Sequence, residues 1–171
     1  LAAALNPPES RSSSLPLLLR VRMSLFNAPA DSPAATPRRA FILQFDGGSR
    51  GNPGPAACGI TLDADDGTPL YELGVFLGNC TNNVAEYQGL IHGLKAAVAL
   101  RADRLTIRAD SQLIVRQING QYKVRHPNIR PLYEQALTLD RQIPNVTITH
   151  HSGEGNTRAE AMANQAMDQR Y

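Results

Sequence analysis

The sequence predicts an α/β domain with a mixed five-stranded sheet, in which an antiparallel meander is joined to parallel strands and helices cover both faces. Two observations predict it. Three apolar segments before residue 80 are separated only by short turns rich in Gly, Pro and Asp, which is typical of antiparallel strands. After residue 83, segments with helical spacing alternate with short extended ones, which is typical of crossovers between parallel strands.

The predicted meander begins at residue 40. The segments AFILQFD (40–46), CGITLDA (58–64) and LYELGVFLG (70–78) are rich in apolar and β-branched residues, as strands are. The connections contain GGSRGNPGP and DDGTP, whose Gly and Pro residues favour tight turns. Short connections of this kind join neighbouring antiparallel strands.

The second half of the chain predicts four helices and two strands. Ala85, Leu90 and Leu94 share one helical face, which predicts a helix over 84–100 that is capped by Asn82 or Asn83. The remaining predicted elements are a strand at 104–110, a helix at 111–120 that ends at Gly120, a helix at 128–143, a strand at 145–151, and a helix at 157–171 capped by Asn156.

Residues 1–39 differ in composition from residues 40–171, and we interpret residues 40–171 as the folded domain. The first segment is rich in Ala, Pro, Ser and Leu without a sustained period, so we expect a disordered tail. Its five arginines against two acidic residues leave residues 1–40 at +3, and residues 41–171 at −1. The Arg- and Ser-rich stretch 11–22 has a transit peptide as its alternative reading.

The composition excludes several classes of protein. No apolar segment is long enough to cross a membrane, so we expect no membrane partner. Cys58 and Cys80 lack the spacing of a zinc site and are expected to be small buried thiols in a reducing compartment. We therefore expect a cytoplasmic location, or an organelle if the tail is a transit peptide.

Four carboxylates are predicted to meet at one edge of the sheet. Asp46 and Asp110 end the first and fourth strands, and Glu86 and Glu160 lie in the first turns of two helices. Each alone has an ordinary explanation, as a turn residue, a helix cap or an acid at a helix N-terminus. Together they would repel one another unless a hard cation such as Mg²⁺ took their oxygens as ligands. Two such ions can hold the attacking water and the leaving oxygen of a phosphodiester.

Four blocks of sequence resemble the type I ribonuclease H family. They are FDGGSRGNPGPAACG, TNNVAEYQGLIHGL, ADSQLIVRQINGQYKV and THHSGEGNTRAEAMANQAMD, which together cover most of residues 41–168 in the family's order. The stretch GQYKVRHP is further similar to the ribonuclease H half of bacterial proteins that also carry an acid phosphatase domain. The resemblance implies the ribonuclease H fold, two Mg²⁺ ions with Mn²⁺ as an alternative, and cleavage of the RNA strand of an RNA/DNA hybrid.

The resemblance also implies roles for the acidic residues. Asp46 corresponds to the Asp that bridges both metals, Glu86 to the Glu near the leaving group, and Asp110 to the second Asp. Glu160 stands where the family usually has Asp, so we expect a weaker second metal and a slower reaction. His150 precedes Glu160 by ten residues, as the family's mobile His precedes its fourth acid, although His151 competes for this assignment.

Further residues match family positions that contact the hybrid. The matching residues are Gly47, Gly48, Asn52, Thr81, Asn82, Asn83 and Gln112, with Thr81 resembling a residue that grips a phosphate of the DNA strand. The glycines are expected to give the substrate room at the backbone. The loop that carries Lys123 and Arg125 is short and lacks Trp, so we expect modest, salt-dependent affinity.

The leading hypothesis is a monomeric, Mg²⁺-dependent hybrid endoribonuclease. The alternative is a module that binds hybrids or other nucleic acid and cleaves weakly, because Glu160 disturbs the metal pair. A third hypothesis keeps the fold and changes the substrate, as in resolvase, integrase or exonuclease relatives.

Overall fold

The computed structural model describes residues 38–170, apart from the side chain of Glu154. Residues 1–37 of the predicted 1–39 tail lie outside the described residues. The elements are β1 (Ala40–Ser49), β2 (Gly54–Ala64), β3 (Pro69–Cys80), α1 (Asn82–Ala99), β4 (Arg104–Ala109), α2 (Gln112–Ile118), α3 (Arg130–Asp140), β5 (Asn145–His150), a 3₁₀ turn (Gly153–Gly155) and α4 (Thr157–Gln169).

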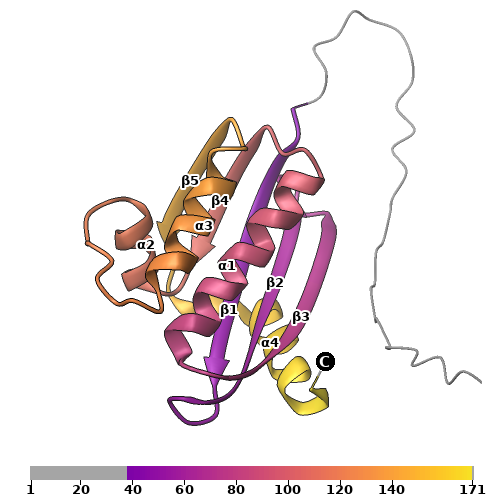
Figure 1. Cartoon of the computed structure of the whole chain (residues 1–171). Coiled ribbons are helices and arrows are strands. Elements are labelled where there is room, and N and C mark those ends of the chain that lie inside the picture. Colours follow the sequence, from indigo (N-terminus) through magenta and orange to yellow (C-terminus); the bar gives the residue numbers. More distant parts are fainter. Residues whose placement is uncertain (1–37, 171) are drawn as a thin grey trace, which may run out of the picture.

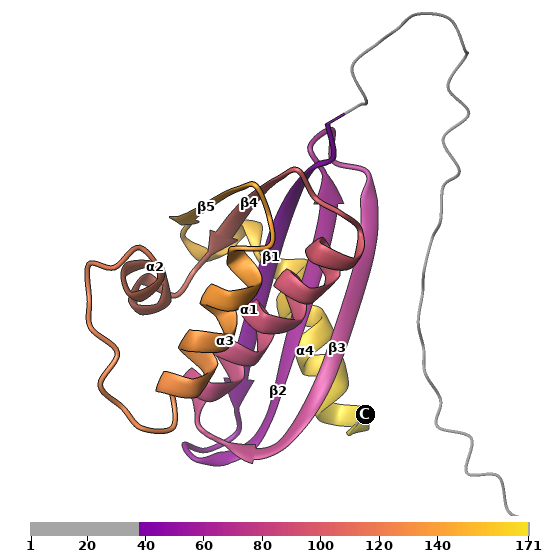
Figure 2. The same cartoon turned by 45° about the horizontal axis from the view of Figure 1, so that its top comes forward.

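The five strands form one mixed sheet in the order β3-β2-β1-β4-β5. The β1–β2 and β2–β3 pairs are antiparallel, and the β1–β4 and β4–β5 pairs are parallel. The predicted meander and the predicted neighbourhood of the first and fourth strands are therefore confirmed. Figures 1 and 2 show α1 and α3 on one face of this sheet and α4 on the other, so the helices do cover both faces.

The two faces of the sheet carry unequal cores. On the face covered by α1, side chains of β1 such as Leu43 and Phe45 pack with Leu90 and Leu94 of the helix, all nearly inaccessible to solvent. On the face covered by α4, the separate apolar cluster consists of Ala57, Ala166 and Met167, with Phe76 packed against it. The larger cluster supplies most of the apolar burial.

Glycine at two strand positions lets the helices approach the sheet. A Cβ atom at Gly47 of β1 would lie 2.3 Å from the backbone carbon of Ala85 in α1. A Cβ atom at Gly59 of β2 would lie 2.0 Å from the carbonyl oxygen of Ala159 in α4. These distances are far below van der Waals contact, so each helix occupies the space that a side chain would need.

Several predicted boundaries are wrong by a few residues. Asp46 does not end β1, because the antiparallel pairing with β2 continues to Ser49. The cap of α1 is Thr81, whose hydroxyl oxygen accepts the Val84 N–H at 3.3 Å, and neither predicted asparagine caps it. Asn156 precedes α4 but makes no capping bond with its side chain.

The start of the folded domain also differs from the predicted one. The Arg39 N–H donates to the Asp103 carboxylate at 2.8 Å, and the Arg39 carbonyl accepts the Asp103 N–H at 2.8 Å. Arg39 therefore belongs to the domain and not to the predicted tail. Within residues 38–170, no helix has the length and apolar character that crossing a membrane requires.

Candidate active site

The parallel pairing of β1 with β4 places two aspartates beside each other. The last paired residues are Gln44 and Arg108, and β4 ends one residue later. Asp46 and Asp110 each lie two residues further along. The two carboxylates are close enough for the charge of Asp110 to raise the pKa of Asp46, although burial of Asp46 raises that pKa more. The sequence-based expectation that both acids emerge on one rim therefore agrees with the geometry.

Glu86 reaches this rim because α1 lies directly on Gly47. A Cβ atom added at residue 47 would lie only 2.4 Å from the backbone nitrogen of Glu86. The helix can therefore come this close only because residue 47 is glycine. Since α1 begins at Asn82, Glu86 lies in its second turn and not in the predicted first one. The expectation that Gly47 makes room for substrate needs correction, because the helix fills that room. At Gly48 the nearest atom to an added Cβ is the Asn82 side-chain oxygen at 3.8 Å, which leaves ordinary space.

Two hydrogen bonds orient the Glu86 carboxylate. The Ser111 hydroxyl donates to Oε2 at 2.9 Å, and the Asn82 side-chain amide donates to Oε1 at 3.3 Å. Burial nevertheless raises the pKa of Glu86 to about 7, with further increases from Asp110 and Asp46 and a decrease from the Ser111 bond. Near neutral pH this side chain is therefore balanced between its neutral and charged forms.

Glu160 comes from the opposite layer of the fold. It lies in the first turn of α4, as predicted, and its charge contributes to the raised pKa of Asp46. Two side chains fix this end of α4. The Asn156 side-chain amide donates to the Phe45 carbonyl at 2.9 Å, and Arg158 forms ion pairs with Asp63 and Glu72 of the sheet.

The four carboxylates have the character of a site for hard cations. Within residues 38–170 none of the four forms an ion pair, although three of them contribute to the raised pKa of Asp46 or Glu86. Uncompensated negative charge and oxygen donors fit Mg²⁺ or Mn²⁺. In the same described part, no three His, Cys, Asp or Glu side chains gather closely enough to surround one ion. The donor chemistry therefore fits a hard cation, although the side chains do not surround a single point.

The two histidines at the end of β5, His150 within the strand and His151 directly after it, have different surroundings. The His150 Nε2 atom lies 3.1 Å from the Asp110 carbonyl oxygen, to which it can donate. The His151 Nε2 atom lies 3.1 Å from the Thr149 hydroxyl, and His151 lines a small cavity of about 80 Å³ together with Asp110 and Asn156. The His150 ring thus contacts the backbone of Asp110, and the His151 ring shares a cavity with Asp110.

The predicted substrate-binding residues fall into two groups. Asn52, Thr81 and Asn83 line one groove of about 270 Å³, which extends between α1 and α2. Asn82 bonds to Glu86, and Gln112 lies exposed at the first position of α2. The amide groups predicted to contact the hybrid therefore border both the carboxylates and the groove.

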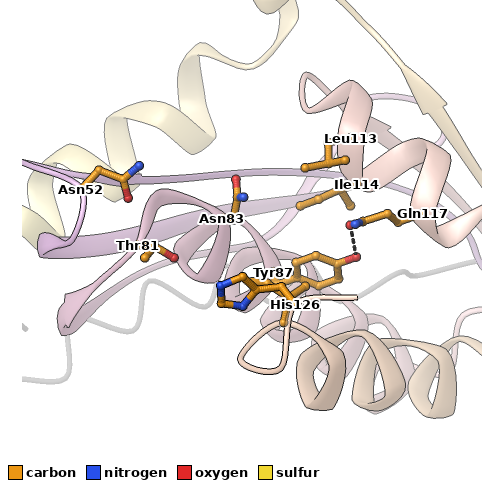
Figure 3. Close-up of a pocket in the computed structure, with 9 residues that line it drawn as sticks. Asn52, Thr81, Asn83, Tyr87, Leu113, Ile114, Gln117 and His126 are labelled. Carbon is orange, nitrogen blue, oxygen red and sulfur yellow. Dashed lines mark hydrogen bonds between the residues drawn. The ribbon is translucent and has the colours of Figure 1, made fainter. Parts of the chain in front are cut away.

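Sequence reasoning missed four residues around this site. Ser111 is the N-cap of α2 and also holds Glu86, whereas the sequence predicted it only as the first residue of the helix. Tyr87 donates its buried hydroxyl to the Gln117 side-chain oxygen at 2.7 Å in the groove wall, and His126 reaches the same groove from a loop. The position of Ser111 directly after Asp110 is a signal that the sequence offers. The roles of Tyr87, Gln117 and His126 depend on contacts between distant segments (Figure 3).

Comparison with known proteins agrees with this architecture. A family profile described as reverse transcriptase-like matches residues 44–166. The bifunctional protein Rv2228c of Mycobacterium tuberculosis is 45% identical over 128 residues, which are 74% of this chain and 35% of that protein. Ribonuclease HI of Halobacterium salinarum is 43% identical over 124 residues, which are 72% of this chain and 62% of that protein. The match thus spans about a third of the mycobacterial relative.

Comparison with solved structures agrees with the comparison of sequences. The N-terminal ribonuclease H domain of Rv2228c superposes with a TM-score of 0.74 at 44% identity, covering 76% of this chain and 94% of that one. The LC11 ribonuclease H1 in complex with an RNA/DNA hybrid has a TM-score of 0.72 at 36% identity, covering 76% and 98%. The sheet order and the layered helices thus define a protein of the ribonuclease H fold. The chain belongs to the ribonuclease H family, in its type I branch.

Proposed function

We propose that this protein is an endoribonuclease that hydrolyses the RNA strand of RNA/DNA hybrids with two divalent cations. The observation that carries the proposal is that Asp46, Glu86, Asp110 and Glu160, from β1, α1, the end of β4 and α4, lie near one edge of the sheet. The hybrid bound to a structural neighbour supports the choice of substrate. We further propose Mg²⁺ as the physiological ion, with Mn²⁺ as an alternative, and a monomeric protein.

Each acid has a distinct proposed part in holding the ions. Asp46 would contribute to both positions, Glu86 and Asp110 to one, and Glu160 to the other, because Glu86 lies close enough to Asp110 to feel its charge while Glu160 acts on Asp46. Bound there, the cations would lower the pKa of a water ligand and neutralise the charge that develops on the phosphate. Ser111 and Asn82 keep the Glu86 carboxylate in one orientation, which limits the reorganisation needed when the charged form is required. His150 is the proposed proton carrier for the leaving group.

Recognition of RNA rests on groups that hydrogen-bond a ribose hydroxyl. The side-chain amides of Asn82, Asn83 and Gln112 can each donate and accept, as a 2′-OH requires. Gly48 keeps open space beside them, since an added Cβ would meet no atom closer than 3.8 Å. A DNA strand lacks the hydroxyl, so these groups favour RNA at the cleaved position.

A second candidate function is a hybrid-binding module with weak or no cleavage. It is favoured by Glu160, which is exposed and carries one methylene more than the Asp that the family usually has. A displaced carboxylate would weaken one cation position and leave the binding surface intact. The alternative predicts binding without turnover, which separates it from the leading proposal.

Cleavage of labelled nucleic acids tests both candidates. The full chain is incubated with an RNA/DNA hybrid, single-stranded RNA or duplex DNA, in Mg²⁺, Mn²⁺ or EDTA, beside an Asp46→Asn control. Metal-dependent cutting confined to the RNA of the hybrid, and lost in the control, is the expected result. Binding of the hybrid without cutting in any metal would refute the enzyme and support the module.

The effect of the longer fourth acid is tested by restoring the shorter one. Glu160→Asp is expected to raise the rate of cleavage and to lower the Mg²⁺ concentration needed for half-maximal rate. An unchanged or lower rate would show that the site is already adapted to glutamate.

A further inference from the structure

We infer that residues 17–25 of the N-terminal segment add a sixth strand to the sheet, antiparallel to β3 along its free edge. These residues lie within the predicted tail, outside the residues that the structure describes. The inference is independent of the proposed function, because it rests on the edge of the sheet opposite β5 and on the sequence before residue 38.

The strand β3 has a partner on one side only. It pairs with β2 at the end of the strand order, no other described strand pairs with it, and Figures 1 and 2 show it at the outer edge of the sheet. Residues 70–78 are only partly buried, whereas residues 56–62 of the neighbouring β2 are all buried. Alternate N–H and C=O groups of such an edge strand point away from its one partner. The edge therefore offers backbone donors and acceptors to a further extended segment.

The central part of β3 suits a further strand. Its pairing with β2 is irregular on both sides of residues 71–76, and this central stretch is regular. Tyr71 and Leu73 pack against the large apolar cluster but remain partly exposed. Glu72 is the only charged residue of β3. Bulges and charges are the usual means by which a sheet edge avoids pairing, and residues 71–76 have no bulge and one charge.

The sequence before the domain contains a matching strand pattern. Every second residue from 17 to 25 is apolar, and the residues between them from 20 to 24 are polar, so that the stretch reads LLLRVRMSL. A period of two places the apolar side chains on one face of a strand. The tail as a whole has no sustained period, but this stretch has the pattern of a half-buried strand.

The connection to the domain fits an antiparallel arrangement. The Ala40 carbonyl at the start of β1 accepts the Asp65 N–H at 3.0 Å, in the turn that leads into β3. Strands lie about 4.8 Å apart, so a strand beyond β3 would lie about 14 Å from β1, a span that residues 26–37 can cross. Because β1 and β3 both begin at this end of the sheet, a segment that arrives there from residue 17 runs opposite to β3.

One register satisfies both faces of the added strand. Opposite charges and apolar pairs directly across two antiparallel strands stabilise a sheet. If Arg22 lies opposite Glu72, then Val21 lies opposite Leu73. The same register places residues 18 and 19 opposite residues 76 and 75, so apolar side chains meet on both faces of the sheet.

The charges near Glu72 favour the tail as the occupant. The Glu72 carboxylate forms an ion pair with Arg158, and the same guanidinium forms a second ion pair with Asp63. Two carboxylates thus share one cation, and Arg22 would supply a second. A second copy of β3 would instead bring another Glu72 to the edge, where like charges repel.

Amide hydrogen exchange in the full chain tests the inference. The outward N–H groups of β3 are expected to exchange slowly in the wild type. Val21→Asp should accelerate their exchange about tenfold, because burial of one Val side chain favours the paired state by roughly that factor. Val21→Ile keeps a β-branched apolar side chain and should retain the protection. Leu5→Asp is the matched control, since it adds the same charge to the tail outside the proposed strand.

Two further measurements examine the register. Nuclear Overhauser contacts between the backbones of Val21 and Leu73 are expected in the wild type and should be lost in Val21→Asp. Arg22→Glu should also weaken the protection of β3, because it places two carboxylates opposite each other, and Arg22→Lys should retain most of it.

Three results would overturn the inference. The first is fast exchange of the outward β3 amides in the wild type, or protection that Val21→Asp leaves unchanged. The second is protection that increases with protein concentration, which would assign the edge to a second copy of the chain. The third is contact of residues 17–25 with an element other than β3. None of these results bears on cleavage of hybrids, so the proposed function stands or fails separately.

Discussion

Replacement of Glu86 by Gln should stabilise the metal-free protein at alkaline pH. Burial raises the pKa of Glu86 from an ordinary 4.5 to about 7, so between these values the folded protein holds this proton more tightly than the unfolded chain does. Raising the pH through that window must therefore lower the free energy of unfolding, by at most about 3 kcal/mol. Gln has no proton to lose, so the variant avoids this decrease.

The structure also sets the cost of the replacement. Glu86 accepts from Ser111 and from Asn82, whereas a Gln side chain has only one oxygen, so one hydrogen bond worth about 1 kcal/mol is lost. In EDTA we expect the variant to be slightly less stable than the wild type near pH 4.5 and about 2 kcal/mol more stable near pH 8.

Urea unfolding across this pH range measures the difference. Glu134→Gln is the control, because Glu134 is an exposed glutamate paired with Arg130 on α3 and should show no such crossover. Mg²⁺ is expected to stabilise the wild type at pH 8 and to have less effect on the Glu86→Gln variant. A stability difference between variant and wild type that stays constant with pH would refute the reasoning.

Three other substitutions test the packing around the site. Gly47→Ala should cost about 1–3 kcal/mol in urea unfolding and reduce cleavage, because its Cβ would lie 2.3 Å from the backbone of α1; normal stability would contradict the close approach. Tyr87→Phe should cost about 1–2 kcal/mol, since it leaves the Gln117 oxygen buried without its donor, and an unchanged urea midpoint would argue against that bond. Arg158→Gln should cost about 1 kcal/mol in low salt and less in high salt, since the side chain is 42% exposed; a loss independent of salt would exclude an ionic origin.

The strand pattern and the motif blocks predicted the sheet, because alternation and short turns are local signals. The end of β1 was placed too early, at Asp46. The Gly and Pro residues after it suggested an immediate turn, yet Gly47 and Gly48 remain extended and pair with β2. The start of α1 was placed late because Thr81, Asn82 and Asn83 are all residues that can cap a helix, and tertiary position decides among them.

The four acids of the candidate site were predicted from their blocks, while their supporting contacts were not. In the sequence, Gly47 suggested room for substrate. Its contact with α1 depends on which face of the sheet the helix covers, which the local pattern does not show. The bond from Ser111 to Glu86 joins residues 25 positions apart, and His126 enters the groove from a loop without regular periodicity. Such contacts follow from packing of distant segments, which hydrophobic pattern alone does not encode.

The attachment of α4 has a consequence for how the protein would lose function on heating. The helix lies on the sheet through Ala159, Ala163 and Ala166, whose methyl groups bury little area, and its apolar cluster is separate from the large core. Local opening of α4 should therefore require less free energy than global unfolding. Because Glu160 leaves with it, inactivation would precede denaturation, and the temperature at which turnover ceases would lie below the midpoint of the main melting transition.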